Sequence, residues 1–395
     1  MTRLTVLLLG KLPPPVMGPA IATQILLRSS LAERCRLVHL NTNLHASLRT
    51  LGTLSVKRVA RSLGVYARFA GLARRERPDV VLIPISQTTL GFLKDSVYIL
   101  LSRLLGRTTL IQLRGSNLQN WLAASSAPTR AYVGAVLRRA QGVIVLGDRL
   151  RHLFEPYLPA ERIYVVPNGG DYQLPAPDRV AERGGPVRVL YLANLIPAKG
   201  IEDVLLAAAR LKEAGLTGFV VDVVGTWKVD AFRARCQAIV GAHGLPVTFH
   251  GPAYGADKMD RMARADVFTF TPRMPEGHPW VIVEALASGL PVVASDQGAI
   301  AESVRDGVNG FVVGSHAPQD IADRLRRLIE DPALRARMSE ASRDLYAAEF
   351  TEQRMVDRLL AALHDVSRSG LGARTPEPAG PAPTRGPRPL ARVDR

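Results

Sequence analysis

Short, continuous apolar runs alternate with amphipathic helical segments along most of this chain of 395 residues. Continuous apolar runs are typical of parallel strands whose two faces are both covered by helices. The pattern therefore predicts an α/β fold built from doubly wound parallel sheets. The ten strands that we expect are residues 4–9, 80–85, 109–113, 143–146, 164–166, 187–192, 220–224, 247–250, 267–271 and 292–295.

The predicted strands fall into two groups, separated by turn-forming residues. The segment 167–171 reads Pro-Asn-Gly-Gly-Asp, and residues 185–186 read Gly-Pro just before a new strand. Such clusters interrupt regular structure. We expect an N-terminal Rossmann-like domain over 1–172, a C-terminal one over 173–350, a C-terminal helix over 351–366 and a Pro/Arg-rich tail without fixed structure over 367–395.

Composition excludes several classes of protein. Hydrophobic residues make up 47% of the chain and charged residues 22%, and no apolar run reaches the length of a membrane span. The first ten residues resemble a strand more than a secretion signal, because Lys11 and three prolines follow in place of a cleavage site. Two cysteines, Cys35 and Cys236, are too few for a disulfide framework. We expect a cytoplasmic protein.

The positive charge is concentrated in the first half. The formal net charge is +16, of which residues 1–172 contribute +15 while residues 173–366 contribute −3. This asymmetry predicts that the first domain faces an anionic partner, such as a phospholipid surface or a phosphate-bearing acceptor. No nucleic-acid motif interrupts the order of strands and helices, so we expect no nucleic-acid partner.

One segment of the first domain is a basic amphipathic helix. Between residues 54 and 77 the sequence places apolar and basic side chains mostly on opposite faces. Such a helix either packs on the sheet with a solvated basic face or lies on an anionic membrane. The expected apolar face is Val59, Leu63, Tyr66, Ala70 and Ala73, and the basic residues are Lys57, Arg58, Arg61, Arg68 and Arg75.

Two carboxylates follow the strand at 267–271. Glu276 and Glu284 are separated by seven residues, and a helix that begins near Pro279 would direct free N–H groups into the crevice at the carboxyl edge of the sheet. Carboxylates accept hydrogen bonds from vicinal sugar hydroxyls, so these two could contact different parts of one elongated ligand. The alternative is that both are ordinary surface acids.

Two loops could supply groups for a phosphate. Lys199 and Gly200 end the loop after the strand at 187–192, so the ammonium would stand at the same sheet edge. In the first domain, the loop 10–18 also joins a strand to a helix, and Gly18 would let a backbone N–H approach an anion. Each signal is weak by itself.

Together these elements resemble retaining glycosyltransferase family 4, whose members have the GT-B fold of two Rossmann-like domains facing across a cleft. The resemblance covers roughly residues 1–365 and is most specific in the second domain. The loop 13–18 and the segment 91–95 resemble members that build bacterial surface polysaccharides. The ordered elements are the segment 166–169, Lys199-Gly200, the pair Glu276 and Glu284 with the following residues 285–294, and the segment 302–310.

The resemblance implies a role for each of these residues. Lys199 would bind the donor diphosphate, Glu284 the ribose hydroxyls, and Glu276 the donor sugar, with the backbone N–H groups of Gly277 and His278 nearby. Gly18 would approach the phosphate from the opposite domain. The fold also implies that the C-terminal helix crosses back onto the first domain.

Two positions depart from the family pattern. Asn194 stands where the family usually has an arginine, and Arg114 stands at a strand end where a histidine is common. Arg114 could supply the missing charge from across the cleft, bind the acceptor or serve the structure alone.

The reaction implied is transfer from a nucleotide sugar, UDP- or GDP-linked, to a saccharide or lipid-linked acceptor. Negative charge develops on the leaving diphosphate, and fixed positive charge and N–H dipoles would stabilise it. We expect no cofactor and no metal, with Lys199 and the helix N-terminus in that role. The alternatives are a non-catalytic anion-binding protein and a nucleotide-sugar epimerase.

His278, Trp280 and Phe249 could each either contact the ligand or serve only the structure. His278 could hydrogen-bond the donor or be structural. Trp280 is expected to pack its helix and not to stack on a nucleobase. The segment 249–252 could frame the base, with Phe249 itself in the core, and both cysteines are expected to be buried.

Overall fold

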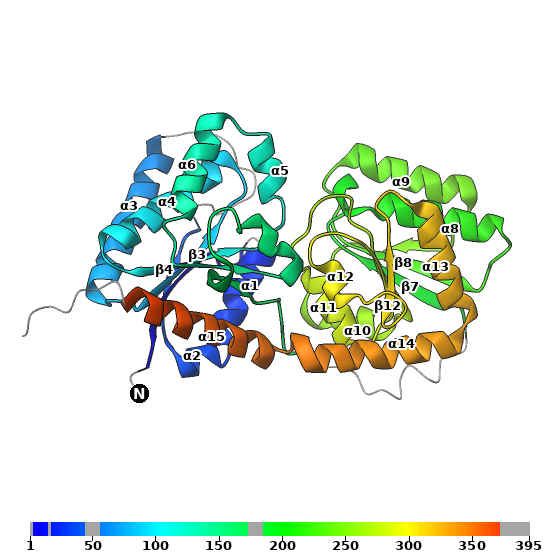
Figure 1. The fold of residues 1–395 in the computed structure, drawn as a ribbon. Coiled ribbons are helices and arrows are strands. Elements are labelled where there is room, and N and C mark those ends of the chain that lie inside the picture. Colours follow the sequence, from blue (N-terminus) through cyan, green and yellow to red (C-terminus); the bar gives the residue numbers. More distant parts are fainter. Residues whose placement is uncertain (1–2, 15–16, 44–55, 173–184, 372–395) are drawn as a thin grey trace, which may run out of the picture.

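The computed structural model describes residues 3–14, 17–43, 56–172 and 185–371, and they form two α/β domains side by side (Figure 1). Each domain has one six-stranded sheet in which all pairings are parallel. The order is β2-β1-β3-β4-β5-β6 in the first and β12-β11-β10-β7-β8-β9 in the second. Helices cover both faces of such sheets, which explains the continuous apolar strands. The predicted pair of doubly wound domains is confirmed.

The first domain contains six strands with their connecting helices. Its elements are β1 (Thr5–Gly10), α1 (Gly18–Arg28), α2 (Leu31–Arg34), β2 (Arg36–Asn41), α3 (Val56–Arg75), β3 (Val80–Ile85), α4 (Thr89–Leu104), β4 (Thr108–Leu113), α5 (Leu118–Ala123), α6 (Ala127–Leu137), β5 (Gly142–Val145), η2 (Asp148–Leu153), η3 (Ala160–Arg162) and β6 (Ile163–Val165).

The second domain repeats this architecture. Its elements are β7 (Val187–Leu192), η4 (Pro197–Lys199), α8 (Ile201–Glu213), β8 (Phe219–Val224), α9 (Asp230–His243), β9 (Val247–Phe249), α10 (Gly255–Ala263), β10 (Val267–Phe270), α11 (Trp280–Ala287), β11 (Val292–Ser295), α12 (Ile300–Ser303), β12 (Gly310–Val313), α13 (Pro318–Glu330), α14 (Pro332–Leu345), η5 (Tyr346–Phe350) and α15 (Glu352–Leu371).

Sheet order fixes where a ligand can bind. In the first sheet β1 lies between β2 and β3, and in the second β7 lies between β8 and β10, so chain connections diverge on either side of these strands. Loops leave the carboxyl ends of such neighbouring strands in opposite directions and open a crevice between them. The loops after β1, β7 and β10 are those that carry Gly18, Lys199 and Glu276.

The last helix, α15, belongs to the core of the first domain. Figure 1 shows it crossing beneath that domain, and its Val356 and Leu363 are fully buried in the same cluster as Val6 and Leu8 of β1. The helix was predicted to end at residue 366 with the tail starting at 367. It instead continues to Leu371, and the Ser367 side chain is buried and donates a 2.9 Å hydrogen bond to the His364 carbonyl within the helix. The remainder of the expected tail lies outside the described residues.

The basic helix predicted between 54 and 77 is α3, and its buried face agrees with the prediction in part. Ala73 is fully buried and Tyr66 packs against the core as expected, but Leu63 is 61% exposed and Phe69, which was not expected on this face, is fully buried. Phe69 packs edge-on against Tyr98 of α4, and this large contact sets the rotation of the helix. The side chains of Lys57, Arg58, Val59 and Arg61 lie outside the described part of the chain.

Direct polar contacts join the domains on one side of the crevice. Glu302 of α12 accepts hydrogen bonds from the backbone N–H groups of Asp148 and Arg149, both at 2.8 Å, at the start of η2. The guanidinium of Arg149 also pairs with Asp296. Gly147 is required here, because a Cβ at this position would lie 2.4 Å from the Cβ of Ala299. Across the described residues, no helix has the length and apolar character needed to cross a membrane.

Candidate active site

A cavity of about 410 Å³ lies between the two domains, and all eight predicted site residues line it. Loops at the carboxyl ends of β1 and β4 form one wall, and loops after β7 and β10, together with α11, form the other. The structure thus brings together residues that are up to 266 positions apart in the sequence. They are Gly18, Arg114, Asn194, Lys199, Glu276, Gly277, His278 and Glu284.

Lys199 is held by a tight turn at the end of η4. The next residue, Gly200, has φ +78°, and a Cβ there would lie 1.8 Å from the carbonyl oxygen of Thr271, so only glycine fits. The hydroxyl of Tyr191 donates a 2.7 Å hydrogen bond to the Lys199 carbonyl. The backbone of this loop is therefore fixed by the sheet beneath it, and the ammonium stands 5.6 Å from the centre of the Phe270 ring.

Lys199 and Glu276 form an ion pair. Their side chains are 25% and 18% exposed, so the pair is partly shielded from water. The sequence assigned these two groups to the diphosphate and the sugar of one ligand. A nucleotide sugar in the cavity would offer phosphate oxygens to Lys199 and hydroxyl donors to Glu276, replacing their mutual contact.

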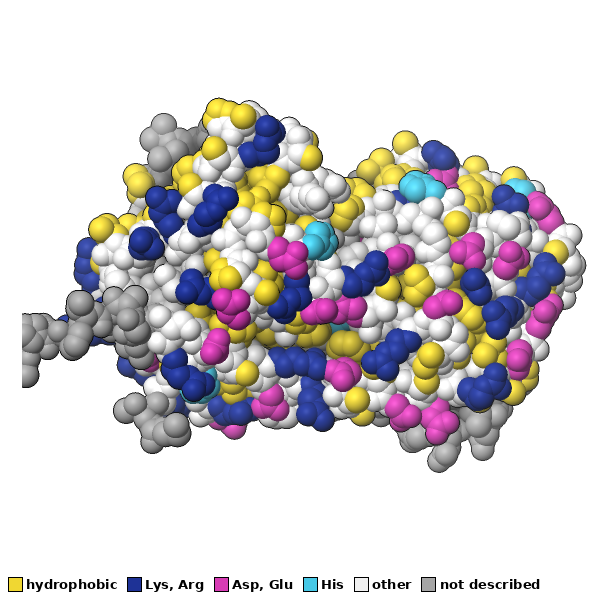
Figure 2. All heavy atoms as spheres, in the orientation of Figure 1, with side chains coloured by type: hydrophobic (Ala, Val, Ile, Leu, Met, Phe, Trp, Pro, Cys, Tyr) yellow, Lys and Arg dark blue, Asp and Glu magenta, His cyan; other side chains and the backbone are white. Residues whose placement is uncertain are grey.

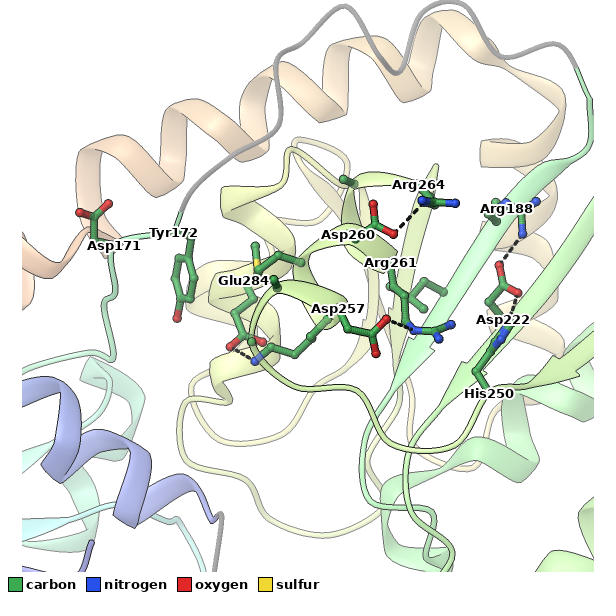
Figure 3. Close-up of a pocket in the computed structure, with 16 residues that line it drawn as sticks. Asp171, Tyr172, Arg188, Asp222, His250, Asp257, Asp260, Arg261, Arg264 and Glu284 are labelled. Atoms are coloured by element: carbon green, nitrogen blue, oxygen red, sulfur yellow. Dashed lines mark hydrogen bonds and ion pairs between the residues drawn. The ribbon is translucent and has the colours of Figure 1, made fainter. Parts of the chain in front are cut away.

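Glu284 lies in the second turn of α11 and is only 5% exposed. Its Oε1 pairs with Lys258 of α10, while its Oε2 is buried and accepts no hydrogen bond (Figure 3). Tyr172 lies beside it, and its hydroxyl is also buried without a partner. Burial, with the nearby Glu284 charge, raises the pKa of Tyr172 well above its usual value. An unsatisfied buried oxygen in a cavity is suited to a hydroxyl donor from a ligand.

Lys258 was missed from the sequence. It lies in α10, whose charged residues Asp257 and Asp260 are typical of a solvent-exposed helix, and no sequence motif distinguishes it. Its distance from Glu284 in sequence, 26 residues, also gave no signal. Only the packing of α10 against α11 brings the two charges together.

The imidazole of His278 serves the structure, and its donor-binding reading is wrong for the side chain. The ring is 3% exposed; Nδ1 accepts the Asn168 N–H at 3.0 Å, so Nε2 carries the proton and donates to Ser303 Oγ at 2.6 Å. Burial, followed by the charge of Arg358, lowers the His278 pKa to about 3. Only its backbone N–H remains for a ligand. Asn168 also donates to the His278 carbonyl at 2.5 Å, locking the interdomain segment.

Arg114 enters the cavity from the end of β4, opposite Lys199. Its guanidinium has one hydrogen bond, 3.4 Å to the Asn168 side chain, and no carboxylate partner among the described residues. Burial lowers its pKa to about 10, so it stays charged at neutral pH. Asn194, in contrast, is exposed at the cavity rim. A Cβ on Gly277 would lie 2.7 Å from the Arg114 carbonyl, so glycine permits this close approach of the domains.

Gly18 is the first residue of α1, and the helix N-terminus opens into the cavity. The preceding Met17 provides no side-chain cap. A Cβ on Gly18 would meet only the Trp280 ring at 3.9 Å, so packing alone does not require glycine here. The free N–H is available to an anion.

The predicted packing roles are confirmed. Trp280 packs against the core cluster that includes Val6 and Met355, and Phe249 packs on Trp227 with ring centres 5.5 Å apart. Cys35 and Cys236 are free and fully buried. Of the segment 249–252 that could frame the base, Pro252 lines the cavity, and so do its neighbours Ala253 and the exposed Tyr254, which were not predicted.

A larger hollow of about 1080 Å³ lies on the other side of Glu284, lined by the second domain together with Asp171 and Tyr172 (Figure 3). Its charged side chains are largely paired with each other. Asp222 contacts Arg188 and His250, and Figure 3 marks the pairs within α10, Asp257 with Arg261 and Asp260 with Arg264. This hollow receives no residue of the first sheet, so the interdomain cavity is the better candidate for chemistry between two substrates.

Comparisons with known proteins agree with this architecture. Residues 176–345 match the family model of the glycosyl transferases group 1. The alpha-D-kanosaminyltransferase of Streptomyces kanamyceticus is 27% identical over 293 residues, which cover 68% of this chain and 73% of that protein. A D-inositol 3-phosphate glycosyltransferase of Nocardiopsis dassonvillei is 31% identical over 240 residues, 57% of this chain. The alignment spans 56% of that relative, about half of its length.

The fold has solved counterparts. The crystal structure of Anabaena HepE in complex with UDP superposes with a TM-score of 0.73 and 20% identity, covering 92% of this chain and all of that one. This similarity extends over both domains and identifies the fold as GT-B. The fold of the chain is therefore GT-B, and within it residues 176–345 match the model of the glycosyl transferases group 1.

Proposed function

We propose that this chain is a retaining glycosyltransferase of family 4, which moves a sugar from a nucleotide-sugar donor to an acceptor bound in the first domain. One observation carries the proposal: the eight predicted residues line a single cavity between the carboxyl edges of two parallel sheets. Such edges are the usual ligand sites of doubly wound folds. The names of the relatives, a kanosaminyltransferase and a D-inositol 3-phosphate glycosyltransferase, support sugar transfer.

The donor would lie along the second domain. Glu284 Oε2, buried and unpartnered, would accept hydrogen bonds from the ribose hydroxyls. Lys199 would pair with the diphosphate and release Glu276 to the sugar hydroxyls. The donor is a UDP- or GDP-sugar in this proposal, and the HepE structures described as complexes with UDP and with UDP-glucose support the uridine form.

The leaving group would be stabilised from both domains. As the bond between the anomeric carbon and the diphosphate breaks, negative charge grows on the phosphate, between Lys199 on one side and Arg114 and the Gly18 N–H on the other. Arg114 thus compensates for the uncharged Asn194. These fixed charges would stabilise the leaving diphosphate without a metal ion, and the cavity would limit the access of water to the reacting atoms.

Transfer would occur on the face that the diphosphate leaves. The acceptor oxygen forms a bond to the anomeric carbon as the bond to the diphosphate breaks, and the acceptor proton passes to the departing phosphate oxygen. No side chain then needs to act as a covalent nucleophile. The sugar keeps its anomeric configuration because the new bond forms on the same face as the old one.

Donor hydrolysis tests this proposal directly. The purified protein is incubated with UDP-, GDP- and ADP-sugars without acceptor, and the released sugar is followed by proton NMR before the anomers equilibrate. We expect slow release from one nucleotide series, with the first-formed anomer matching the donor. The opposite anomer contradicts retention, and release from none of them favours the anion-binding alternative. Conversion of the intact donor sugar to its epimer favours the epimerase.

The acceptor is a saccharide or a lipid-linked saccharide of bacterial surface polysaccharide or glycolipid synthesis in this proposal, and an exposed leucine row supports a membrane location. Helix α4 exposes four leucines at spacings that place them on one face, although an apolar helix face is normally covered. They are Leu90 (74% exposed), Leu93 (43%), Leu100 (37%) and Leu104 (78%).

Charge favours an anionic lipid surface over a second copy of the chain. Helices α3, α4 and α6 contain nine lysines and arginines and one acid, Asp95, which is buried. Figure 2 displays basic and hydrophobic side chains together over α4 and α6 on the face in view. Two such surfaces would repel each other, whereas anionic headgroups would attract both the charges and the leucines.

Vesicle flotation tests this location. We expect the full chain to float with phosphatidylglycerol vesicles and not with phosphatidylcholine vesicles. The double variant Leu90→Ser/Leu104→Ser should lose most of this binding, while Val308→Ser, which alters an exposed apolar residue of the second domain, should retain it. Equal flotation of both variants would remove α4 from the proposed surface.

A further inference from the structure

A second cavity, of about 270 Å³, lies within the first domain beside the donor cavity. It opens at the carboxyl ends of β1, β3 and β4, where the first sheet has its topological switch. Met17, Pro19 and Arg114 line both cavities, so the two spaces adjoin. A ligand in this second cavity would lie next to the donor diphosphate and sugar, on the side opposite Lys199.

The charges that line this cavity do not balance. Lys11, Lys94 and Arg114 are cationic, and Asp95 is the one carboxylate among the lining residues. Asp95 is already committed: its Oδ2 accepts from the Ser86 N–H at 2.8 Å and the Ser86 hydroxyl at 2.6 Å, and its Oδ1 lies 3.4 Å from Lys94. Two positive charges remain without a carboxylate.

Lys11 is the clearest of the uncompensated groups. It follows β1 directly, is partly buried, and makes no hydrogen bond or ion pair within the described parts of the chain. Burial and then the charge of Lys94 lower its pKa, and the charge of Asp95 opposes them without cancelling them. A partly buried cation without a partner is costly unless a ligand neutralises it.

Two glutamines give an independent sign of a ligand. The Gln112 side chain, at the end of β4, is 5% exposed and has no hydrogen-bond partner among the described residues. Gln87, after β3, has a buried Oε1 that is also unpartnered. Buried amides are almost always hydrogen-bonded, so these groups await donors and acceptors such as sugar hydroxyls.

We propose that this cavity binds the acceptor sugar and selects one that carries an acidic group, a carboxylate or a phosphate, between Lys11 and Lys94. The proposal rests on the proposed transferase function and names the acceptor class for it. Gln87 and Gln112 would bind hydroxyls of the same sugar. A neutral sugar would leave the charge of Lys11 uncompensated and would therefore bind more weakly.

Binding of small acids to the full chain tests this assignment. Glucose, glucuronic acid and glucose 6-phosphate are titrated in turn, with ionic strength held constant, and affinity is read from thermal stabilisation. We expect at least one acid to bind about tenfold or more tightly than glucose. Whichever acid binds better identifies a carboxylate or a phosphate as the recognised group.

Lysine variants locate the bound acid. Lys11→Gln and Lys94→Gln should each weaken the acid about tenfold, whereas Lys11→Arg, which keeps the charge, should stay within about threefold. Lys228→Gln removes an exposed lysine of the second domain and should change nothing. Lys94→Gln removes the ion pair with Asp95 and could weaken folding. Lys11→Gln breaks no ion pair, so it tests the cavity even if Lys94→Gln does not fold.

Two results would overturn the proposal. The first is that the acids show no preference over glucose: either glucose binds as tightly as both acids, or neither acid binds while a nucleotide sugar does. The other is acid binding that survives in Lys11→Gln and Lys94→Gln. The same variants are titrated with UDP- and GDP-sugars, whose stabilisation should persist. If no nucleotide sugar stabilises the unmodified chain but an acid binds in a Lys11-dependent way, the result counts against the proposed donor site and not against the acceptor cavity.

Discussion

The two walls of the cleft differ in how their charges are satisfied. In the second domain, Lys199 pairs with Glu276 and Lys258 pairs with Glu284. In the first domain, Lys11 and Arg114 have no carboxylate partner among the described residues. The charges of the donor wall are thus paired, although Glu284 Oε2 has no partner, and a donor must exchange the existing ion pairs for its own contacts. The acceptor wall has unmet charge, which a ligand would neutralise.

This difference also explains the net charge of the chain. The second domain balances its charges and has a slightly negative total, while the first has an excess of +15. Part of that excess faces the cavity beside the donor site, and part lies on the outer helices with the exposed leucines of α4. One basic domain could therefore meet both an acidic acceptor and an anionic membrane.

The largest expected effect comes from breaking the donor wall at Lys199. Lys199→Ala removes a fixed charge from the leaving diphosphate and should lower kcat about 10²- to 10³-fold, the scale seen when one transition-state donor is removed. Initial rates at saturating donor measure this loss. Lys228→Ala serves as the control. A change of less than about threefold in Lys199→Ala would place the main stabilisation elsewhere.

A smaller effect is expected at the other donor pair. Glu284→Gln preserves shape but removes the charge that accepts ribose hydroxyls, so donor affinity should fall roughly 10- to 100-fold. At saturating donor, kcat should change little, in contrast to Lys199→Ala. Titration with the active nucleotide sugar gives the affinity. If turnover falls and affinity does not, the roles of the two residues are reversed.

The contact of His278 with Asn168, which joins the two domains, should be sensitive to acid. Burial lowers the His278 pKa from 6.5 to about 3. Between those pH values the unfolded chain binds a proton that the folded chain does not. Stability owed to this group is therefore constant above pH 6.5 and falls as the pH drops toward 3, by up to about 1.4 kcal/mol per pH unit.

Urea unfolding at pH 7.5 and pH 5 measures this dependence. His278→Asn removes the titrating group, so the difference in unfolding free energy between the two pH values should shrink relative to the unmodified chain. Loss of the Asn168 contact should also lower the stability of the variant at pH 7.5. An identical pH dependence in both proteins would mean that His278 does not titrate between pH 7.5 and pH 5.

The smallest effect is expected at the contact that bridges the domains. Arg149 and Asp296 are 48% and 47% exposed, and exposed ion pairs contribute about 0–1 kcal/mol. Asp296→Asn should therefore lower the unfolding free energy by less than about 1 kcal/mol. Urea unfolding at neutral pH checks this. A larger loss would indicate that Arg149 helps to hold the two walls together.

The sequence predicted the fold because its main signal is local. Ten of the twelve strands in the described residues were expected from continuous apolar runs. β2 was missed because Arg36, His39 and Asn41 interrupt its apolar run, and β12, Gly310–Val313, was missed as well. On the buried face of α3, Leu63 was wrong and Phe69 was missed, because the contact of Phe69 with Tyr98 is tertiary.

The candidate site was predictable where residues lie close in sequence. Glu276 and Glu284 share one loop and helix, and Lys199 lies in the short connection after β7. Lys258 and Lys11 were missed, because their partners or surroundings come from distant elements. His278 was misassigned for the same reason: its ring is occupied by Asn168 and Ser303, 110 and 25 residues away.

The central claim is that the interdomain cavity binds a nucleotide sugar through Glu284. Thermal stabilisation of the purified chain by UDP-, GDP- and ADP-sugars tests it most directly, since a ligand of the folded state raises the Tm. We predict a shift confined to one nucleotide series and abolished in Glu284→Ala. No shift with any of these donors, or an equal shift in Glu284→Ala, would contradict the claim.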